Sequence, residues 1–104
     1  MLCVFCDALV KERVKTIKLN ERDCFVLPVE IINEKTKFAQ PAEVFLSEYQ
    51  KRDLEHADAG SHIVLSGDLS IRAFLMSDGS AKAKLIIYLK SYKIITMSVA
   101  HDLF

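Results

Sequence analysis

The alternation of apolar residues in two neighbouring stretches is the feature that most limits how this chain can fold. Every odd position is apolar or glycine from Ile63 to Leu75, and again from Ala81 to Leu89. A period of two is that of a β-strand with one buried face. Because Asp78-Gly79 lies between the two stretches, they are expected to form an antiparallel hairpin whose odd-numbered face is buried.

The length of the turn decides which residues of this hairpin face one another. A two-residue loop at Asp78-Gly79 would pair Leu75 with Lys82 and place an apolar side chain opposite a charged one. A three-residue loop, Ser77-Asp78-Gly79, pairs Leu75 with Ala81 and supplies a glycine where the turn needs a left-handed residue. We therefore expect the three-residue loop, with a longer loop of the same parity as the alternative.

In this register the other face of the hairpin is both basic and aromatic. Arg72 lies opposite Lys84, and a like-charge pair costs roughly tenths of a kcal/mol unless an anion lies beside it. Proteins that bind single-stranded nucleic acid combine cationic side chains, which contact phosphates, with aromatic side chains on which bases stack. A solvated face with its aromatic side chains buried between subunits is the alternative. The candidate contacts are Arg72, Phe74, Lys82, Lys84, Tyr88 and Lys90.

The rest of the chain predicts three further strands and one helix. Ser47 followed by Gln50 is a capping-box pattern and Gly60 follows as a stop, so residues 47–58 are expected to be helical. Pro28 cannot donate a ladder hydrogen bond, so its strand should be at an edge, bulged or unpaired on one side. Strands are expected at residues 2–10, 24–32 and 38–46, with 11–23 as a long charged loop.

The resulting order is β-β-β-α-β-β, an all-β chain with one short helix. This is the order of the OB-fold, a five-stranded β-barrel. An SH3-like barrel or another small sheet is the alternative. A length of 104 residues fits one domain, which we place at residues 1–98, with residues 99–104 as a short C-terminal tail.

Composition restricts the classes of partner. Fourteen basic and fourteen acidic residues give a net charge of zero, which argues against holding duplex DNA by bulk charge but permits a local basic patch. No apolar run is long enough to cross a membrane, and residues 1–10 are expected to form a strand rather than a signal peptide. Three cysteines without an export signal favour reduced thiols in the cytoplasm.

Metal binding and catalysis are not expected. Cys3 and Cys6 have the spacing of half a zinc site, but residues three apart on a strand point to opposite faces, so buried, inert thiols are favoured. His56 and His62 have no nucleophile with an orienting acid at a recognisable spacing. Neither an enzyme nor a cofactor is therefore predicted.

From Phe38 onward the chain resembles the bacterial single-stranded DNA-binding protein family, which includes primosomal replication protein N. The resemblance rests on FAQPAEVFLSEY, AGSHIVLSGDLSIRAF, the Asp-Gly turn and the final AKLIIYLKSYKII. It implies an OB-fold that binds single-stranded DNA, as a homo-oligomer (dimer or tetramer), in replication, repair or replication restart. The family's contact positions fall at Phe38, Arg72, Phe74, Lys82 and Lys84.

Two further expectations concern protein partners. Members of this family often end in a tail whose Asp-and-Phe tip docks onto partner proteins, and Asp102, Leu103 and Phe104 resemble that tip. These three are the candidate partner-binding residues, although a frayed or packed terminus is the interpretation we favour. The neutral charge and the absence of tryptophan favour an alternative function, an OB-fold adaptor for a replication or mobile-element enzyme with little DNA contact.

Overall fold

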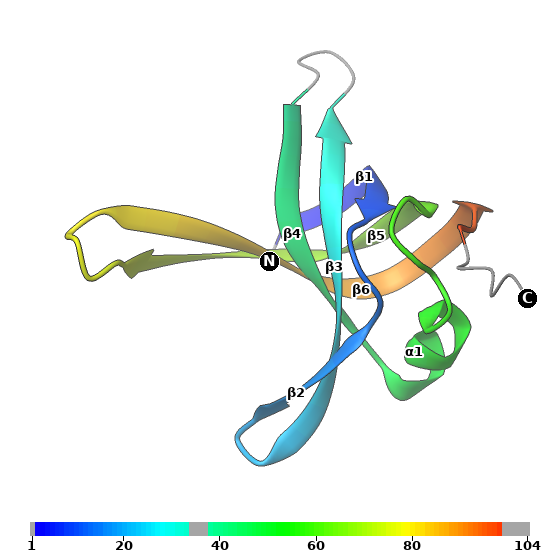
Figure 1. Cartoon of the computed structure of the whole chain (residues 1–104), viewed down its shortest axis with the longest axis horizontal. Helices are drawn as coiled ribbons and strands as arrows, with labels where there is room; N and C mark the ends of the chain where they lie inside the picture. The colour runs from blue at the N-terminus through cyan, green and yellow to red at the C-terminus, as the bar shows by residue number, and fades with distance from the viewer. Residues whose placement is uncertain (1, 34–37, 99–104) are drawn as a thin grey trace, which may run out of the picture.

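The computed structural model describes residues 2–33 and 38–98 as six strands and one short helix (Figure 1). The tail residues Asp102, Leu103 and Phe104 lie outside the described residues. The elements are β1 (Leu2–Val10), β2 (Lys15–Leu19), β3 (Arg22–Asn33), β4 (Phe38–Leu46), α1 (Glu48–Leu54), β5 (His62–Leu75) and β6 (Ala81–Thr96).

Five of the strands close into a barrel. The strands are hydrogen-bonded in the order β1-β5-β6-β4-β3-β2, and β1 returns to pair with β3, where Ala8 lies opposite Ile31. Neighbouring strands are antiparallel except β4 and β6, which run parallel. The strands β1, β3, β4, β6 and β5 form a closed ring in this order. Along the chain, the helix lies between the third and fourth of these strands, β4 and β5. This is the OB-fold predicted from the sequence.

The stretch 11–23 is not the charged loop expected from the sequence, because it contains β2. This strand pairs with β3 from Lys15 opposite Val26 to Leu19 opposite Arg22. β3 is 12 residues long, so its first part extends beyond the barrel, and β2 covers the edge that this part would otherwise expose. Figure 1 shows the resulting β2–β3 hairpin below the barrel.

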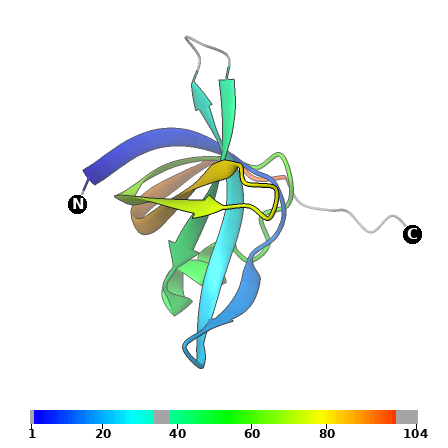
Figure 2. The same ribbon diagram turned by 90° about the vertical axis from the view of Figure 1, so that its left-hand side faces the viewer.

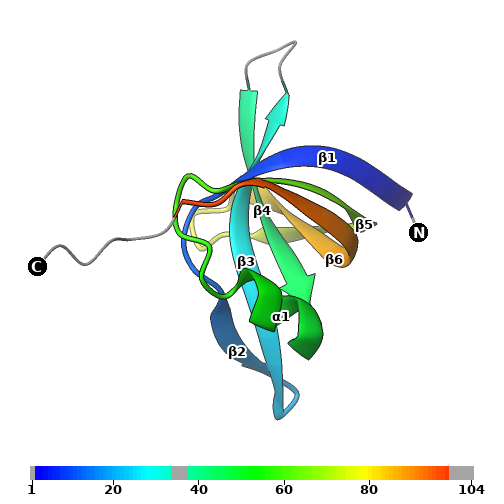
Figure 3. The ribbon, with the colours of Figure 1, turned by 90° about the vertical axis from the view of Figure 1, so that its right-hand side faces the viewer.

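The core lies inside the barrel and is closed at one end by α1 (Figure 3). The helix supplies the fully buried Leu54. The other large apolar side chains that are fully buried are Leu27, Val29, Val44, Ile63, Leu65 and Ile87. They come from β3, β4, β5 and β6, so the barrel and the helix share one core.

The helix begins as predicted and ends earlier. At its start the Gln50 amide donates to the Ser47 hydroxyl at 3.2 Å, and the Ser47 amide donates to the Gln50 side chain at 2.8 Å, which is the predicted capping box. At its end the Ala57 amide donates to the Leu54 carbonyl at 3.1 Å, a tighter turn than that of an α-helix. Ala57, which follows the helix, is only 1% exposed and belongs to the core.

Pro28 lies at a point where one side of β3 has no ladder partner. It lies opposite Glu43 on β4, between the part of β3 that pairs with β2, which ends at Val26, and the part that pairs with β1, which begins at Val29. The Pro28 carbonyl accepts a hydrogen bond from the Lys11 amide at 2.9 Å, so the proline nitrogen faces this same gap. The predicted strand that is locally unpaired on one side is confirmed.

The turn of the β5–β6 hairpin is the three-residue loop expected from the register. Leu75 lies opposite Ala81, and the Met76 amide donates to the Ser80 carbonyl at 2.7 Å. The Gly79 amide donates to the Met76 carbonyl at 3.0 Å, and Gly79 has a φ of 88°. A residue with a side chain is strained at this φ, which explains why a glycine stands here.

The apolar face of this hairpin is buried over only part of its length. Ile63 and Leu65 are fully buried, whereas Ile71 is 62% and Leu75 is 79% exposed. The prediction that the whole odd-numbered face is buried is therefore wrong for residues 71–84, which we call the arm. Figure 1 shows the arm extending away from the barrel, and in Figure 2 the arm points toward the viewer.

Candidate nucleic-acid interface

The side chains of β2 to β6 that point away from the core form a continuous surface, which we call the outer face. The strand register decides which residues are neighbours on it. One row of directly opposed residues crosses five strands and consists of Lys15, Val26, Phe45, Tyr88 and Asp68. The next row consists of Pro28, Glu43, Ile86 and Ser70. The outer face therefore carries apolar, aromatic and charged side chains at adjacent positions.

An aromatic pair lies near the middle of the outer face. The rings of Phe45 and Tyr88 have centroids 5.5 Å apart and are tilted by 56°. Tyr88 is 37% exposed and Phe45 is half-buried. The sequence predicted Tyr88 as a contact but missed Phe45. The alternation within β4 could have identified it, because Val44 and Leu46 point into the core and Phe45 must point the other way.

Two apolar side chains beside this pair are buried on the outer face itself. Val26 is 3% and Ile86 is 4% exposed, yet neither belongs to the cluster inside the barrel. Val26 lies directly opposite Phe45, and Ile86 lies directly opposite Glu43. Larger neighbouring side chains therefore cover both of them, and the outer face has an apolar floor of its own.

A groove of about 410 Å³ lies on the outer face beside this floor. Its lysines come from three separate segments: Lys11 from the β1–β2 connection, Lys15 from β2 and Lys84 from β6. Its apolar lining includes Ile17, Val26, Pro28 and Pro41. The sequence did not identify Lys11 or Lys15 as contacts, because they lay in a stretch expected to be a loop. The groove thus combines apolar side chains with a cationic rim.

A second hollow, of about 570 Å³, adjoins this groove. It is lined by Phe45 and Tyr88 together with residues at the start of α1 and of β3. Glu43 lines the first groove and precedes Phe45 by two positions on the same face of β4, so the two hollows lie over neighbouring parts of this strand. Together they provide a path across the outer face from the base of the arm to α1.

The cations of the outer face differ in their partners. Lys84 forms an ion pair with Glu43, and Lys90 lies 3.4 Å from Asp68. Arg72 is exposed, lies directly opposite Lys84, and has no acidic partner among residues 2–33 and 38–98. Arg72 and Lys84 are therefore not the uncompensated like-charge pair expected from the sequence, because Glu43 compensates the charge of Lys84.

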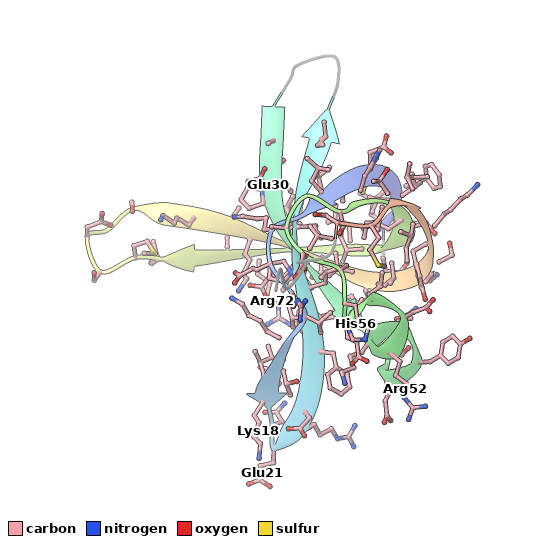
Figure 4. The ribbon with its side chains drawn as sticks, turned by 45° about the vertical axis from the view of Figure 1, so that its right-hand side comes forward. Lys18, Glu21, Glu30, Arg52, His56 and Arg72 are labelled. Atoms are coloured by element: carbon pink, nitrogen blue, oxygen red, sulfur yellow. The ribbon has the colours of Figure 1, made fainter. Side chains whose placement is uncertain are left out.

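The predicted residues do not all come together. Figure 4 shows Arg72 near the centre of the molecule, far from Lys18 and Glu21 at the end of the β2–β3 hairpin. Lys82 is exposed further along the arm, where it lies opposite Phe74. Phe38 lies at the start of β4, about 23 Å along the strand from Phe45 at the usual rise per residue. The structure therefore places Arg72, Lys84 and Tyr88 on the part of the outer face beside the hollows, and places Lys90 further along β6 and Phe38 at the far end of β4.

The cysteines do not form a metal site in the described part of the chain. Cys3 is exposed, which corrects the expectation that all thiols are buried, and Cys6 packs against the core. Burial raises the pKa of the Cys6 thiol, and the neighbouring Asp7 adds to this effect. Within residues 2–33 and 38–98 no group of three or more metal-ligating side chains occurs, and no helix is long and apolar enough to cross a membrane.

Comparison with solved structures identifies the same architecture in other proteins. The mitochondrial single-stranded DNA-binding protein Rim1 of S. cerevisiae superposes with a TM-score of 0.64 at 14% identity, over 93% of this chain and 97% of that one. A small single-stranded DNA-binding protein from Streptomyces coelicolor gives 0.62 at 9% identity, over 89% and 93% of the two chains. No family model and no curated protein sequence matches this chain. At these identities the likeness establishes the fold.

Proposed function

We propose that this protein binds single-stranded DNA across the outer face of its barrel, without catalysing a reaction. The observation that carries the proposal is the aromatic pair of half-buried Phe45 and exposed Tyr88, beside a groove with a lysine rim. OB-folds bind oligonucleotides on the face of their second and third barrel strands, between the loops that follow the first and fourth strands. Here those strands are β3 and β4, and those loops contain β2 and the arm.

The chemistry of binding follows from these side chains. Bases stack on Phe45 and Tyr88, which contributes about 1–3 kcal/mol for each base. Phosphates contact Lys84, Arg72 and the lysines of the groove rim. Because the net charge is zero, the affinity depends on this local arrangement of cations and falls as salt is added. The resemblance to primosomal replication protein N favours a role in replication, repair or replication restart in the cytoplasm.

We also propose that the protein is a homo-oligomer, for which β1 offers a surface. Among the described strands, β1 is paired on only one side from Leu2 to Asp7, because its pairing with β3 begins at Ala8. Leu2 and Phe5 are 63% and 78% exposed on this part of the strand. An apolar strand with a free edge readily pairs with a second copy. If so, Phe5→Lys will lower the mass measured in solution, and an unchanged mass in a folded variant will contradict this interface.

The binding proposal is tested by titrating a labelled oligothymidine with protein while fluorescence anisotropy is recorded. Tyr88→Ala is expected to weaken binding about tenfold, since it removes one stacking surface. Tyr49→Ala is the matched control, because Tyr49 is 78% exposed on α1 and lines neither hollow. An equal effect of the two substitutions contradicts the assignment of the outer face.

The same titration separates DNA binding from the adaptor function. Preference for the single strand over a duplex of the same length, with an affinity that falls as salt is added, supports DNA binding. Absence of binding to either DNA at micromolar protein favours the protein–protein adaptor. In that case the exposed apolar side of the arm, with Ile71 and Leu75, is the first surface to examine for a protein partner.

A further inference from the structure

The ion pair between Glu43 and Lys84 lies inside the groove that the proposed function assigns to DNA. We propose that Glu43 acts as an internal competitor of the DNA phosphate: it neutralises Lys84 in the free protein and must be displaced when a strand binds. Glu43 thereby sets the affinity and the salt dependence of binding. This inference rests on the proposed function and adds a residue that opposes binding.

The position of the pair supports this exchange. Glu43 and Lys84 extend from the neighbouring parallel strands β4 and β6, and both line the groove. The Glu43 side chain is 27% exposed and that of Lys84 is 46% exposed, so the ammonium group is the more accessible partner. A phosphate approaching from solvent therefore reaches Lys84 without first displacing other described side chains that bury it.

Arg72 provides the second reason for the exchange. It lies directly opposite Lys84 on β5 and has no acidic partner among the described residues. Directly opposed residues on a sheet have their Cβ atoms about 5 Å apart, so one phosphate can contact both cations. A phosphate at this position thus contacts two cations, Arg72 and Lys84, whereas among the described residues Glu43 is ion-paired with Lys84 alone. This difference favours the DNA phosphate over the carboxylate.

The other ion pairs of this face differ from it in position or in exposure. Lys90 and Asp68 are 3.4 Å apart but line neither hollow. Lys15 and Glu12 also line the groove and are 2.8 Å apart, but both side chains are about half exposed and the two residues are only three positions apart along the chain. Such exposed local pairs contribute little. Glu43 is therefore the carboxylate whose removal should change DNA binding most.

The salt dependence gives the inference a measurable signature. For single strands, each phosphate neutralised by the protein adds about 0.7 to the negative slope of log affinity against log salt. In the wild type the displaced Glu43 carboxylate attracts a cation from solution, which offsets the counterion that Lys84 releases from the strand. Glu43→Gln frees Lys84 and should therefore steepen the slope by about 0.7, which amounts to about a fivefold affinity difference over a tenfold range of salt.

The experiment is the oligothymidine titration over a tenfold range of salt with four proteins: wild type, E43Q, K84Q and the double variant. We expect E43Q to bind about fivefold more tightly than wild type at the low-salt end and to approach it at the high-salt end. We also expect K84Q to lose more affinity when residue 43 is Gln than when it is Glu. Circular dichroism establishes that each variant is folded.

Glu55→Gln is the matched control. Glu55 is also ion-paired, to Lys51 at 3.1 Å on α1, and lines neither hollow. It changes the net charge by the same single unit as E43Q. If E55Q tightens binding as much as E43Q does, the effect is one of net charge and the inference about Glu43 is overturned.

The remaining outcomes separate this inference from the function on which it rests. If wild type binds the oligonucleotide and E43Q has the same affinity and slope, the competitor role is wrong while DNA binding stands. If K84Q loses equal affinity in both backgrounds, the two residues act independently and the exchange is likewise wrong. If no protein binds even at the lowest salt, the proposed function fails and the inference fails with it.

Discussion

The two halves of the β5–β6 hairpin share one sequence pattern and differ in their surroundings. In the barrel, Leu65 and Ile87 are fully buried. In the arm, Leu75 at an equivalent position of the same alternation is 79% exposed. An alternating pattern defines which side chains share a face, but a face is buried only where another strand or helix lies over it. The barrel half therefore contributes stability, and the arm is available for contacts with other molecules.

The basic residues of the arm also differ in their surroundings, depending on whether they lie at its base or further out. Arg72 and Lys84, at its base, lie beside the groove and the aromatic pair on the outer face. Lys82, further along, lies on the extended ribbon. The residues near the base therefore have a fixed setting made by β3 and β4, whereas those further out depend on the arm alone.

The largest expected difference between the two halves is in the free energy of unfolding that Leu65→Ala and Leu75→Ala remove. Leu65→Ala removes a fully buried side chain and should lower the free energy of unfolding by about 2–5 kcal/mol. Leu75→Ala should change it by less than about 0.5 kcal/mol, because the side chain is already in water. Urea unfolding measures both. Similar losses for the two variants would indicate that the arm is covered in solution and would remove the contrast.

A second pair of substitutions compares the two glycines of the hairpin. A Cβ at Gly67, where the ladder has a bulge, would lie 2.2 Å from the backbone oxygen of Tyr88. Gly67→Ala should therefore cost about 3 kcal/mol, because backbone must move. At Gly79 a Cβ meets nothing within 4 Å, and only the φ of 88° opposes it, so Gly79→Ala should cost about 1 kcal/mol. Equal losses in thermal unfolding would contradict this difference in packing.

The smallest effect concerns the contact that holds α1 against the barrel half. Burial, the hydrogen bond from Tyr92 to Asp53 and the charge of that carboxylate raise the pKa of Tyr92 to about 12. Because this pKa lies above the unfolded value of about 10, the contact contributes fully below pH 10 and its contribution is lost as the pH rises toward 12.

Tyr92→Phe removes this titration. Its melting temperature should be lower than that of wild type at pH 8, and the difference should shrink as the pH is raised above 10. A constant difference over this range would show that Tyr92 does not titrate as its contact with Asp53 implies.

The order of the barrel strands and the helix along the chain was predictable because its determinants are local in sequence. The alternation on β5 and β6 required Leu75 to face Ala81, and Gly79 completed the only short turn compatible with it. Ser47 and Gln50 likewise specified the start of the helix. By contrast, β2 was missed. The charges around Ile17 concealed its alternation, and its partner among the described strands, the first part of β3, extends beyond the barrel.

The candidate site was predictable in part. The cross-strand neighbours of Arg72 and Tyr88 within the hairpin follow from its register, and they were predicted correctly. Phe45 and Glu43 were not identified, because they join the hairpin through the parallel pairing of β4 with β6. That pairing links segments about 40 positions apart, and no turn between them specifies which residues meet.

The sequence by itself determined the faces of the strands, the turn, the helix start and the order of elements that forms an OB-fold. Only the tertiary structure decided which apolar faces are covered, since Leu65 meets the core and Leu75 does not. It also decided that Lys84 meets Glu43 before any DNA can. The physical reason is the separation of the interacting residues along the chain. Alternation and turns depend on residues that are close in sequence, whereas burial and ion pairing depend on strands that only the closed barrel brings together.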